Sequence, residues 1–350
     1  MGAAGSKTGG GKGGGGGGGE DHLSAAWKLG MAGGYGALIA VNAMAMNGTM
    51  GPTNAKISGL WPTSITPAGY AFSIWGIIFL LQGGGVILSL ISSSDRSNVN
   101  QKNAAAVCKP WLMMWAAQNL WQLVFVHAPL SQNAPASSQL AIFVPCSFFL
   151  CAAYASGLEA CRRLRKVESN VASTLFLRLP SAINAGWLSA ASCIGIALVG
   201  QSMAGGKEEL GAGLPVTLAG MASVGAIASF YSWGAGEGRG GESEMGRLSV
   251  ESTRRGGVAM VYVAVVTIHF PGSLLTVVSG SLSLGYAGAV SWALAAILRG
   301  SNASPSVRTA ASVGIGAIGM AAGAAILLAV LRKGRGEGEG KAKPLAAQSM

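Results

Sequence analysis

The sequence predicts an all-α protein, a polytopic transmembrane helical bundle of eight or nine spans. Half of the 350 residues are hydrophobic, only 11% are charged, and the mean hydropathy is +0.46. The charged residues gather in short clusters, and the apolar runs between them are about 20 residues long, which is the length of helix that crosses a bilayer. The 55 glycines suit close packing of membrane helices, because small residues let backbones approach one another.

Nine apolar segments are the predicted spans. They lie at residues 28–47, 68–92, 110–128, 137–160, 176–200, 213–234, 257–279, 282–299 and 308–331. The seventh contains His269 and Pro271 and is followed at once by the eighth, so this pair is two spans, one span with a re-entrant segment, or a helical hairpin. Four regions result. They are a disordered Gly-rich cytoplasmic tail (1–26), a five-helix membrane core (27–202), additional transmembrane helices (203–331) and a basic flexible tail (332–350).

The Lys and Arg residues indicate the orientation. The N-terminal tail and the loops after the second, fourth and sixth spans are basic, whereas the loops between them carry only Lys56 and Lys207. Basic loops remain on the cytoplasmic side, so the N-terminus is predicted to be cytoplasmic. The basic tail after Leu331 favours that side as well, which requires eight spans, while hydropathy favours nine. This topology explains the net charge of +11, so we expect no nucleic-acid partner.

The N-terminus also matches a lipidation pattern. The start MGAAGSK offers Gly2 for N-myristoylation, with Ser6 at the required offset. This modification needs a cytosolic N-terminus, which agrees with the predicted orientation. The sequence therefore predicts an integral, multi-pass protein of the lipid bilayer, and names no particular membrane.

The ionisable residues argue against catalysis and ion coupling. All 13 acidic residues fall in tails, loops or span ends, whereas ion-coupled transporters hold their ion with an intramembrane carboxylate. The three histidines are too scattered for a haem or metal site, and no nucleophile elbow, P-loop or H-E-x-x-H motif occurs. The five cysteines form no C-x-x-C pair and are interpreted as packing residues. We therefore expect neither an enzyme nor a metal protein.

The second span begins with an aromatic helix face. Pro67 suits the first turn of a helix, and Thr66 before it is expected to be the N-cap. Phe72, Trp75 and Phe79 are spaced by three and four residues and therefore share one face. Two interpretations stay open for these rings, an interfacial aromatic belt and the wall of a ligand pocket.

The third span combines tryptophans with amides. Trp111, Trp115 and Gln118 are spaced by four and three residues and share a face, with Asn119 close to it and Trp121 following. Buried amides in a membrane need partners. The amides are therefore either interhelical hydrogen-bonding groups or the polar edge of a ligand pocket.

Three spans resemble the TspO/translocator-protein family, and most closely its longer "tryptophan-rich sensory protein" branch, with extra C-terminal spans. The second span is similar to P-P-G-W-x-F-x-x-x-W-x-x-x-Y through Pro67, Gly69, Phe72, Trp75 and Phe79, with Ala68 in place of a proline, Phe79 in place of the Tyr, and two rather than three residues between Phe72 and Trp75. The third resembles N-x-x-W through Gln118 and Trp121, and the fifth resembles P-x-x-x-x-x-G-W through Pro180, Gly186 and Trp187. The resemblance covers residues 28–200 and, more weakly, 285–298 and the final span.

The resemblance implies a five-helix core around a pocket that binds tetrapyrroles, sterols or other planar apolar ligands. The residues implied to line it are Phe72, Trp75, Phe79, Trp115, Gln118, Trp121, Asn184 and Trp187. A porphyrin or a sterol is then expected as ligand rather than as a cofactor. Three functions remain open: a ligand-binding or sensory protein, a facilitative carrier without ion coupling, and a membrane scaffold whose aromatics only pack.

Glycine pairs at the GxxxG spacing occur in the first and last spans. They are Gly30/Gly34 and Gly319/Gly323. This spacing is typical of tight helix packing within a chain and also of a homodimer face.

Overall fold

The computed structural model describes residues 23–93, 95, 97–204 and 281–339, and the regular structure in these ranges is entirely helical. The helices are α1 (Ala25–Met46), α2 (Asn54–Leu60), α3 (Ile74–Ile91), α4 (Val99–Phe125), α5 (Ala136–Leu164), α6 (Val171–Ser173), α7 (Leu179–Met203), α12 (Ser281–Leu298) and α13 (Pro305–Glu339), with a 3₁₀ turn η1 (Gly69–Ser73) before α3 and a π turn η2 (Thr174–Arg178) before α7. The all-α prediction is confirmed. The predicted spans 213–234 and 257–279, and Gly2, lie outside the described residues.

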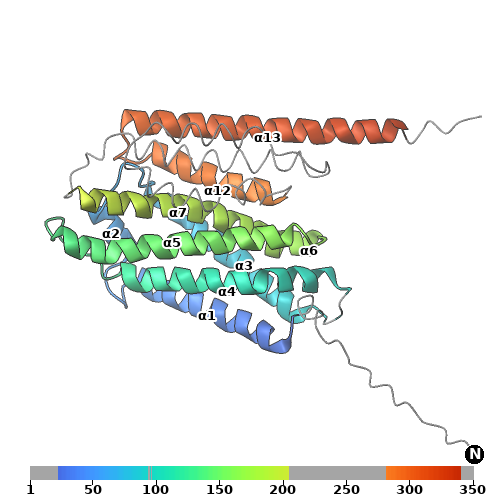
Figure 1. The fold of residues 1–350 in the computed structure, drawn as a ribbon, viewed down its shortest axis with the longest axis horizontal. Coiled ribbons are helices and arrows are strands. Elements are labelled where there is room, and N and C mark those ends of the chain that lie inside the picture. The colour runs from blue at the N-terminus through green and yellow to red at the C-terminus, as the bar shows by residue number, and fades with distance from the viewer. Residues whose placement is uncertain (1–22, 94, 96, 205–280, 340–350) are drawn as a thin grey trace, which may run out of the picture.

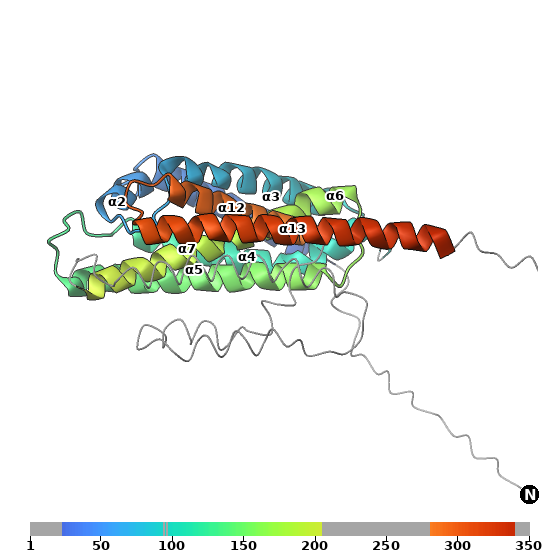
Figure 2. The same ribbon diagram turned by 90° about the horizontal axis from the view of Figure 1, so that it is seen from above.

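The long helices lie side by side along one axis (Figures 1 and 2). α4 packs between α1 and α5, α5 packs on α7, and α3 contacts both α1 and α7. These contacts place α1, α3, α7, α5 and α4 in a ring. α12 packs on the outside of this ring against α7, and α13 packs on α12.

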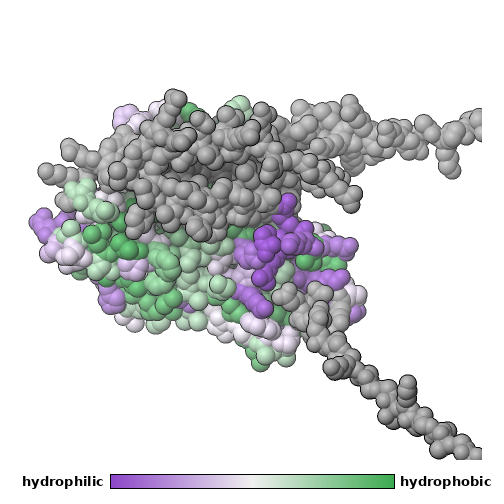
Figure 3. Space-filling model, in the orientation of Figure 1, coloured by the Kyte–Doolittle hydropathy of each residue, from purple (hydrophilic) through white to green (hydrophobic). Residues whose placement is uncertain are grey.

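Several of these helices are long and apolar enough to cross a membrane. The spans that meet both criteria are Ala25–Met46, Gly69–Ile91, Ala136–Leu164 and Val171–Met203, and Leu284–Leu298 is a shorter apolar helix. In Figure 3 hydrophilic residues gather at the two ends of the bundle, most densely where α1 begins, and a hydrophobic band lies between them. The prediction of a helical membrane bundle is confirmed.

α4 begins earlier than expected from hydropathy. Its predicted span starts at residue 110, but the helix starts at Val99 and continues through Pro110. Asn98 caps it, because its side chain accepts hydrogen bonds from the backbone N–H of Asn100 at 2.9 Å and of Gln101 at 3.3 Å. The first turns are helical but polar, so a hydropathy criterion does not detect them.

The start of the second span also differs from the prediction. Thr66 does not cap the helix; its hydroxyl accepts a hydrogen bond from the backbone N–H of Thr63 at 2.8 Å. Ala68, the residue before η1, donates its N–H to the carbonyl of Ala296 in α12 at 3.0 Å. The N-cap prediction was wrong because this loop bonds to itself and to a helix that is distant in sequence.

α12 runs parallel to α7. A Cβ on Gly285 would lie 3.0 Å from the Cβ of Ala182, and a Cβ on Gly186 would lie 3.0 Å from the Cβ of Ala289. From the first contact to the second, the position moves four residues toward the C-terminus on both helices, as it does when two helices run parallel. α13 then runs back along the bundle, and its C-terminal part extends at the end where α1 begins (Figure 1).

One of the two GxxxG pairs is used within the chain. A Cβ on Gly34 would lie 2.6 Å from Cδ2 of Leu112, so the glycine lets α1 approach α4 closely. Around Gly319 of α13, by contrast, no atom of the described residues lies within 4 Å of an added Cβ. A homodimer remains a prediction.

Candidate functional site

Four of the eight predicted site residues form one group of rings, called here the aromatic set: Phe72, Trp75, Phe79 and Trp187. Trp75 stacks on Phe79, with ring centroids 5.5 Å apart and planes 29° apart. Trp187 of α7 meets Trp75 edge to face at 6.2 Å and meets Phe72 in the same way at 5.8 Å. Edge-to-face and offset-stacked contacts are the favoured geometries of aromatic pairs. The spacing of Phe72, Trp75 and Phe79 therefore places them on one side of η1 and α3, next to α7.

The aromatic set lies in the seam between α3, α7 and α12. Trp187 is 1% exposed, and the apolar residues clustered with it are Ala71, Ile74, Ile78, Ala190, Ala289, Ala293 and Ala296. Trp75 and Phe79 are half-buried and also contact the main core of the bundle. Phe72 remains 38% exposed at the edge. The surroundings of Trp187 are thus uncharged and supplied in part by α12.

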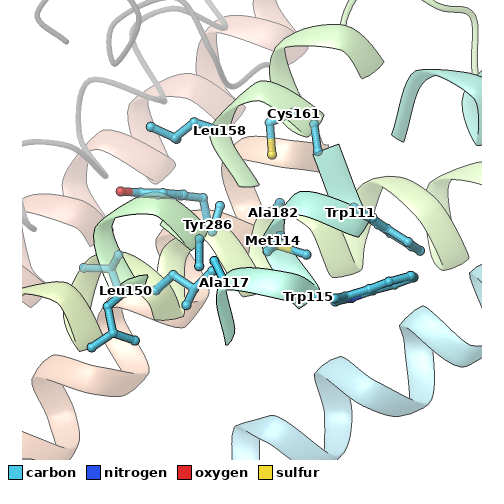
Figure 4. Packing of buried hydrophobic residues seen from close by; sticks show 14 of the residues in the cluster. Trp111, Met114, Trp115, Ala117, Leu150, Leu158, Cys161, Ala182 and Tyr286 are labelled. Atoms are coloured by element: carbon cyan, nitrogen blue, oxygen red, sulfur yellow. The ribbon is translucent and has the colours of Figure 1, made fainter. Parts of the chain in front are cut away.

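Trp115 lies deeper in the ring of helices. It packs against Trp111 and Tyr35, with ring centroids 5.4 Å and 5.7 Å away. Its indole N–H donates to Oε1 of Gln82 in α3 at 3.2 Å. In Figure 4 the two α4 tryptophans lie one above the other, on the far side of Met114 from Tyr286. Trp115 is therefore a packed core residue beside the aromatic set rather than a member of it.

Gln118 and Asn184 form an interhelical pair. Nε2 of Gln118 in α4 donates to Oδ1 of Asn184 in α7 at 3.3 Å, and Nδ2 of Asn184 lies 3.4 Å from Sδ of Met114. Both amides are buried. This is the hydrogen bonding expected of amides that join membrane helices. It uses only part of the hydrogen-bonding capacity of Gln118.

Trp121 lies toward the end of the bundle that carries α2. It stacks on Phe125 at 5.1 Å with planes 20° apart. On the next residue, Gln122 exchanges two hydrogen bonds of 2.8 Å with Asn54 of α2, which seats the short helix on α4. The structure therefore separates Trp121 from the aromatic set.

Three buried polar atoms near these residues lack a hydrogen-bond partner within the described part of the chain. They are Nε1 of Trp187, Oε1 of Gln118 and Nε2 of Gln82. A buried donor or acceptor without a partner costs about 1–3 kcal/mol. A bound molecule that paired with such an atom would offset that cost.

The sequence interpretation missed two contributors to this region. Gln82 bonds to Trp115, and its signal was an amide inside an apolar span next to three glycines. α12 supplies Ala289 and Ala293 next to Trp187, but no feature of its sequence indicates on which helix it packs.

A family model described as TSPO-like protein matches residues 29–234, more than half of the chain. The match contains most of α1, the helices from α2 to α7 and all eight predicted site residues. α12, which covers Trp187, lies beyond it. No curated protein and no solved structure matches the chain.

Proposed function

The chain belongs to the TSPO-like protein family and is an integral membrane protein, and from this premise we propose that it binds a planar apolar ligand at the aromatic set. A tetrapyrrole or a sterol has the required chemistry. The observation that carries the proposal is the arrangement around Trp75, which stacks on Phe79 and meets the edge of Trp187. Rings of α3 and α7 thus converge, and Trp75 and Phe79 on α3 are only half-buried.

Stacking would supply much of the affinity. An aromatic pair contributes about 0.5–1.5 kcal/mol beyond the burial of its area, and a flat conjugated ligand can meet several rings at once. The residues clustered with Trp187 are uncharged, so this part of the site favours an uncharged region of the ligand. The pair Gln118 and Asn184 would provide its polar side.

We assign this protein a sensory or ligand-handling role rather than a chemical reaction. The proposed contacts are ring faces, amides and an indole N–H, and none of these is a general acid, a base or a nucleophile at neutral pH. Gln118 would orient the ligand through its buried Oε1 atom, which has no partner within the described helices.

A membrane scaffold is the competing function, and a specific observation favours it. Trp115 and Trp187 are each 1% exposed, and both make ring contacts with neighbouring residues. A scaffold needs these contacts only for packing and binds no ligand saturably.

A binding titration tests the proposal. Purified protein is titrated with protoporphyrin IX and, separately, with a fluorescent sterol, and the absorbance or emission of the probe is followed. We expect saturation at a fixed ratio of probe to protein for at least one probe. Signals that rise without saturation for both would support the scaffold. Probe flux across proteoliposomes, measured on the same preparation, would identify a facilitative carrier.

A further inference from the structure

We infer that the ligand reaches the aromatic set sideways from the bilayer, through the seam between η1, α7 and α12, and that α12 is the movable cover of this seam. The inference rests on the proposed ligand-binding function. It assigns a role to a helix that lies beyond the family match at residues 29–234. One side of α12 faces Trp187.

α12 covers Trp187 with small side chains. We call the three residues Ala289, Ala293 and Ala296 the alanine wall; each is at most 2% exposed. Small residues permit close approach, as Gly186 shows, since a Cβ there would lie 2.5 Å from the carbonyl oxygen of Tyr286. The wall has no large side chain inserted between the rings. The alanine wall can therefore move away from the aromatic set without pulling a large side chain out from between the rings.

The two ends of α12 are held differently. Toward its C-terminal end, the indole N–H of Trp292 donates to the carbonyl of Ala71 at 3.0 Å, and the ring of Trp292 meets Tyr70 edge to face at 5.4 Å. Trp292 is 39% exposed and Tyr70 is 40% exposed, so this latch lies at the rim. It bonds to η1, the 3₁₀ turn that leads into α3.

The other end of α12 is anchored in the interior. The hydroxyls of Tyr286 and Tyr154 of α5 lie 2.9 Å apart, and Tyr286 is 2% exposed. Movement of the C-terminal half of α12 would break the rim latch and the bond from the Ala68 N–H to the carbonyl of Ala296, while the tyrosine pair would hold the N-terminal half in place.

Close contacts obstruct the routes to the aromatic set from the two ends of the bundle. At the end where α1 begins, a Cβ on Gly84 would lie 2.4 Å from the ring of Phe176, so α3 and η2 are in close contact. At the α2 end, the indole N–H of Trp61 donates to the carbonyl of Pro129 at 2.8 Å, beside the paired amides of Asn54 and Gln122. At the α12 seam, the α12 residues clustered with Trp187 are small, and the large side chains of Trp292 and Tyr70 lie at the rim.

Trp187 offers the contact that would receive the ligand behind this wall. Its Nε1 atom has no hydrogen-bond partner within the described helices, although the residue is 1% exposed. An indole N–H only donates. The ligand class that fits is a planar apolar molecule with a hydrogen-bond acceptor at its edge, such as a carbonyl, ether or hydroxyl oxygen or an unprotonated ring nitrogen.

A reversible crosslink between the wall and α7 tests the inference. Ala182 meets Gly285 and Gly186 meets Ala289. One further step of four residues on each helix predicts that Ala190 faces Ala293, and both belong to the cluster around Trp187, so we expect the variant A190C/A293C to form a disulfide. Stopped-flow association of protoporphyrin IX is measured on the oxidised and the reduced variant in liposomes. We expect oxidation to slow association at least tenfold and a reductant to restore it. The single variants A190C and A293C are the matched controls, and each should associate at the same rate with and without the oxidant.

The outcomes separate the inference from the proposed function. Equal rates in the oxidised and reduced variant, with saturable binding in both, would overturn the α12 cover and leave the ligand site intact. Failure of the pair to crosslink would contradict the register of α12 on α7. Absence of saturable binding in the reduced protein would instead overturn the proposed function and the inference with it.

A second variant loosens the cover. Trp292→Phe removes the N–H that bonds to Ala71 and keeps an aromatic ring against Tyr70. We expect several-fold faster association of protoporphyrin IX than with the wild type. An unchanged association rate would show that the latch does not control access.

Discussion

Tyr154 of α5 and Tyr286 of α12 join two parts of the chain through a hydrogen bond of 2.9 Å between their hydroxyls. Tyr154 lies within the segment that matches the TSPO-like family, and Tyr286 lies beyond it. Both side chains belong to the main hydrophobic core or pack against it. α12 is therefore part of the membrane core rather than an appendage to it.

The tyrosine pair predicts a measurable coupling. Tyr154→Phe removes one hydroxyl and leaves the other in the core, so we expect the protein to lose about 0.6–1.7 kcal/mol of stability, the range found for hydrogen bonds between membrane helices. Thermal unfolding in detergent of Tyr154→Phe, Tyr286→Phe and the double variant measures it. The double variant should lose less than the sum of the single losses. Strictly additive losses would show that the two hydroxyls are not coupled.

Gly186 predicts how closely α12 is seated. A Cβ at this position would lie 2.5 Å from the backbone oxygen of Tyr286, which cannot rotate away. Gly186→Val should therefore displace α12 and cost about 1–3 kcal/mol or more, as overpacking does. Protease resistance and melting temperature report the change. Gly288→Ala is the matched control on α12, because no atom of the described residues lies within 4 Å of an added Cβ there, and it should lower neither reading.

The amide pair predicts a separation of stability from ligand binding. Asn184→Leu leaves Gln118 buried without its acceptor, which should cost about 1–3 kcal/mol. The double variant Gln118→Leu/Asn184→Leu should recover part of this loss, because neither member of the pair is left buried without the other. If the amides are the polar side of the ligand site, the double variant still binds protoporphyrin IX more weakly than the wild type. Full binding by the stable double variant would assign the amides to helix packing alone.

The direction of α12 predicts the topology of the chain ends. α7 ends near α2, while α12 begins beside the start of α7, so the connection between Ala204 and Ser281 starts and finishes at opposite ends of the bundle. α13 then returns to the end where α1 begins (Figure 1). This agrees with eight spans rather than nine. Epitope tags at the two chain ends, tested in sealed cells before and after permeabilisation, should both behave as cytoplasmic. Tags on opposite sides would contradict this arrangement.

Local sequence patterns anticipated the features that depend on one helix. The spacing of Phe72, Trp75 and Phe79 predicted a shared face, and the structure places all three near Trp187 or one another. Apolar length predicted the spans closely where the helix is apolar throughout. It failed at α4, whose first turns are polar and lie before Pro110.

Contacts between helices were not predictable in the same way. Periodicity indicates which residues share a face but not which helix that face meets. Three features are tertiary contacts of this kind. Gln118 bonds to Asn184 of α7, and the alanine wall lies over Trp187. The carbonyl of Ala296 accepts the N–H of Ala68, where the sequence predicted a cap by Thr66. The sequence supplied the resemblance that united eight residues in one pocket, whereas the structure gathers four of them in the aromatic set.

The central claim is that the aromatic set binds a planar apolar ligand, and one titration tests it most directly. Protoporphyrin IX absorbance is followed on adding wild-type protein, the double variant Trp75→Ala/Trp187→Ala, and the control Trp27→Ala, whose tryptophan is 42% exposed at the start of α1. Following the probe rather than protein emission keeps the loss of tryptophans from affecting the signal. Circular dichroism first establishes that each variant is folded. We expect saturable binding by the wild type and the control, and a loss of at least tenfold in affinity in the folded double variant. Equal affinity in all three proteins would contradict the claim.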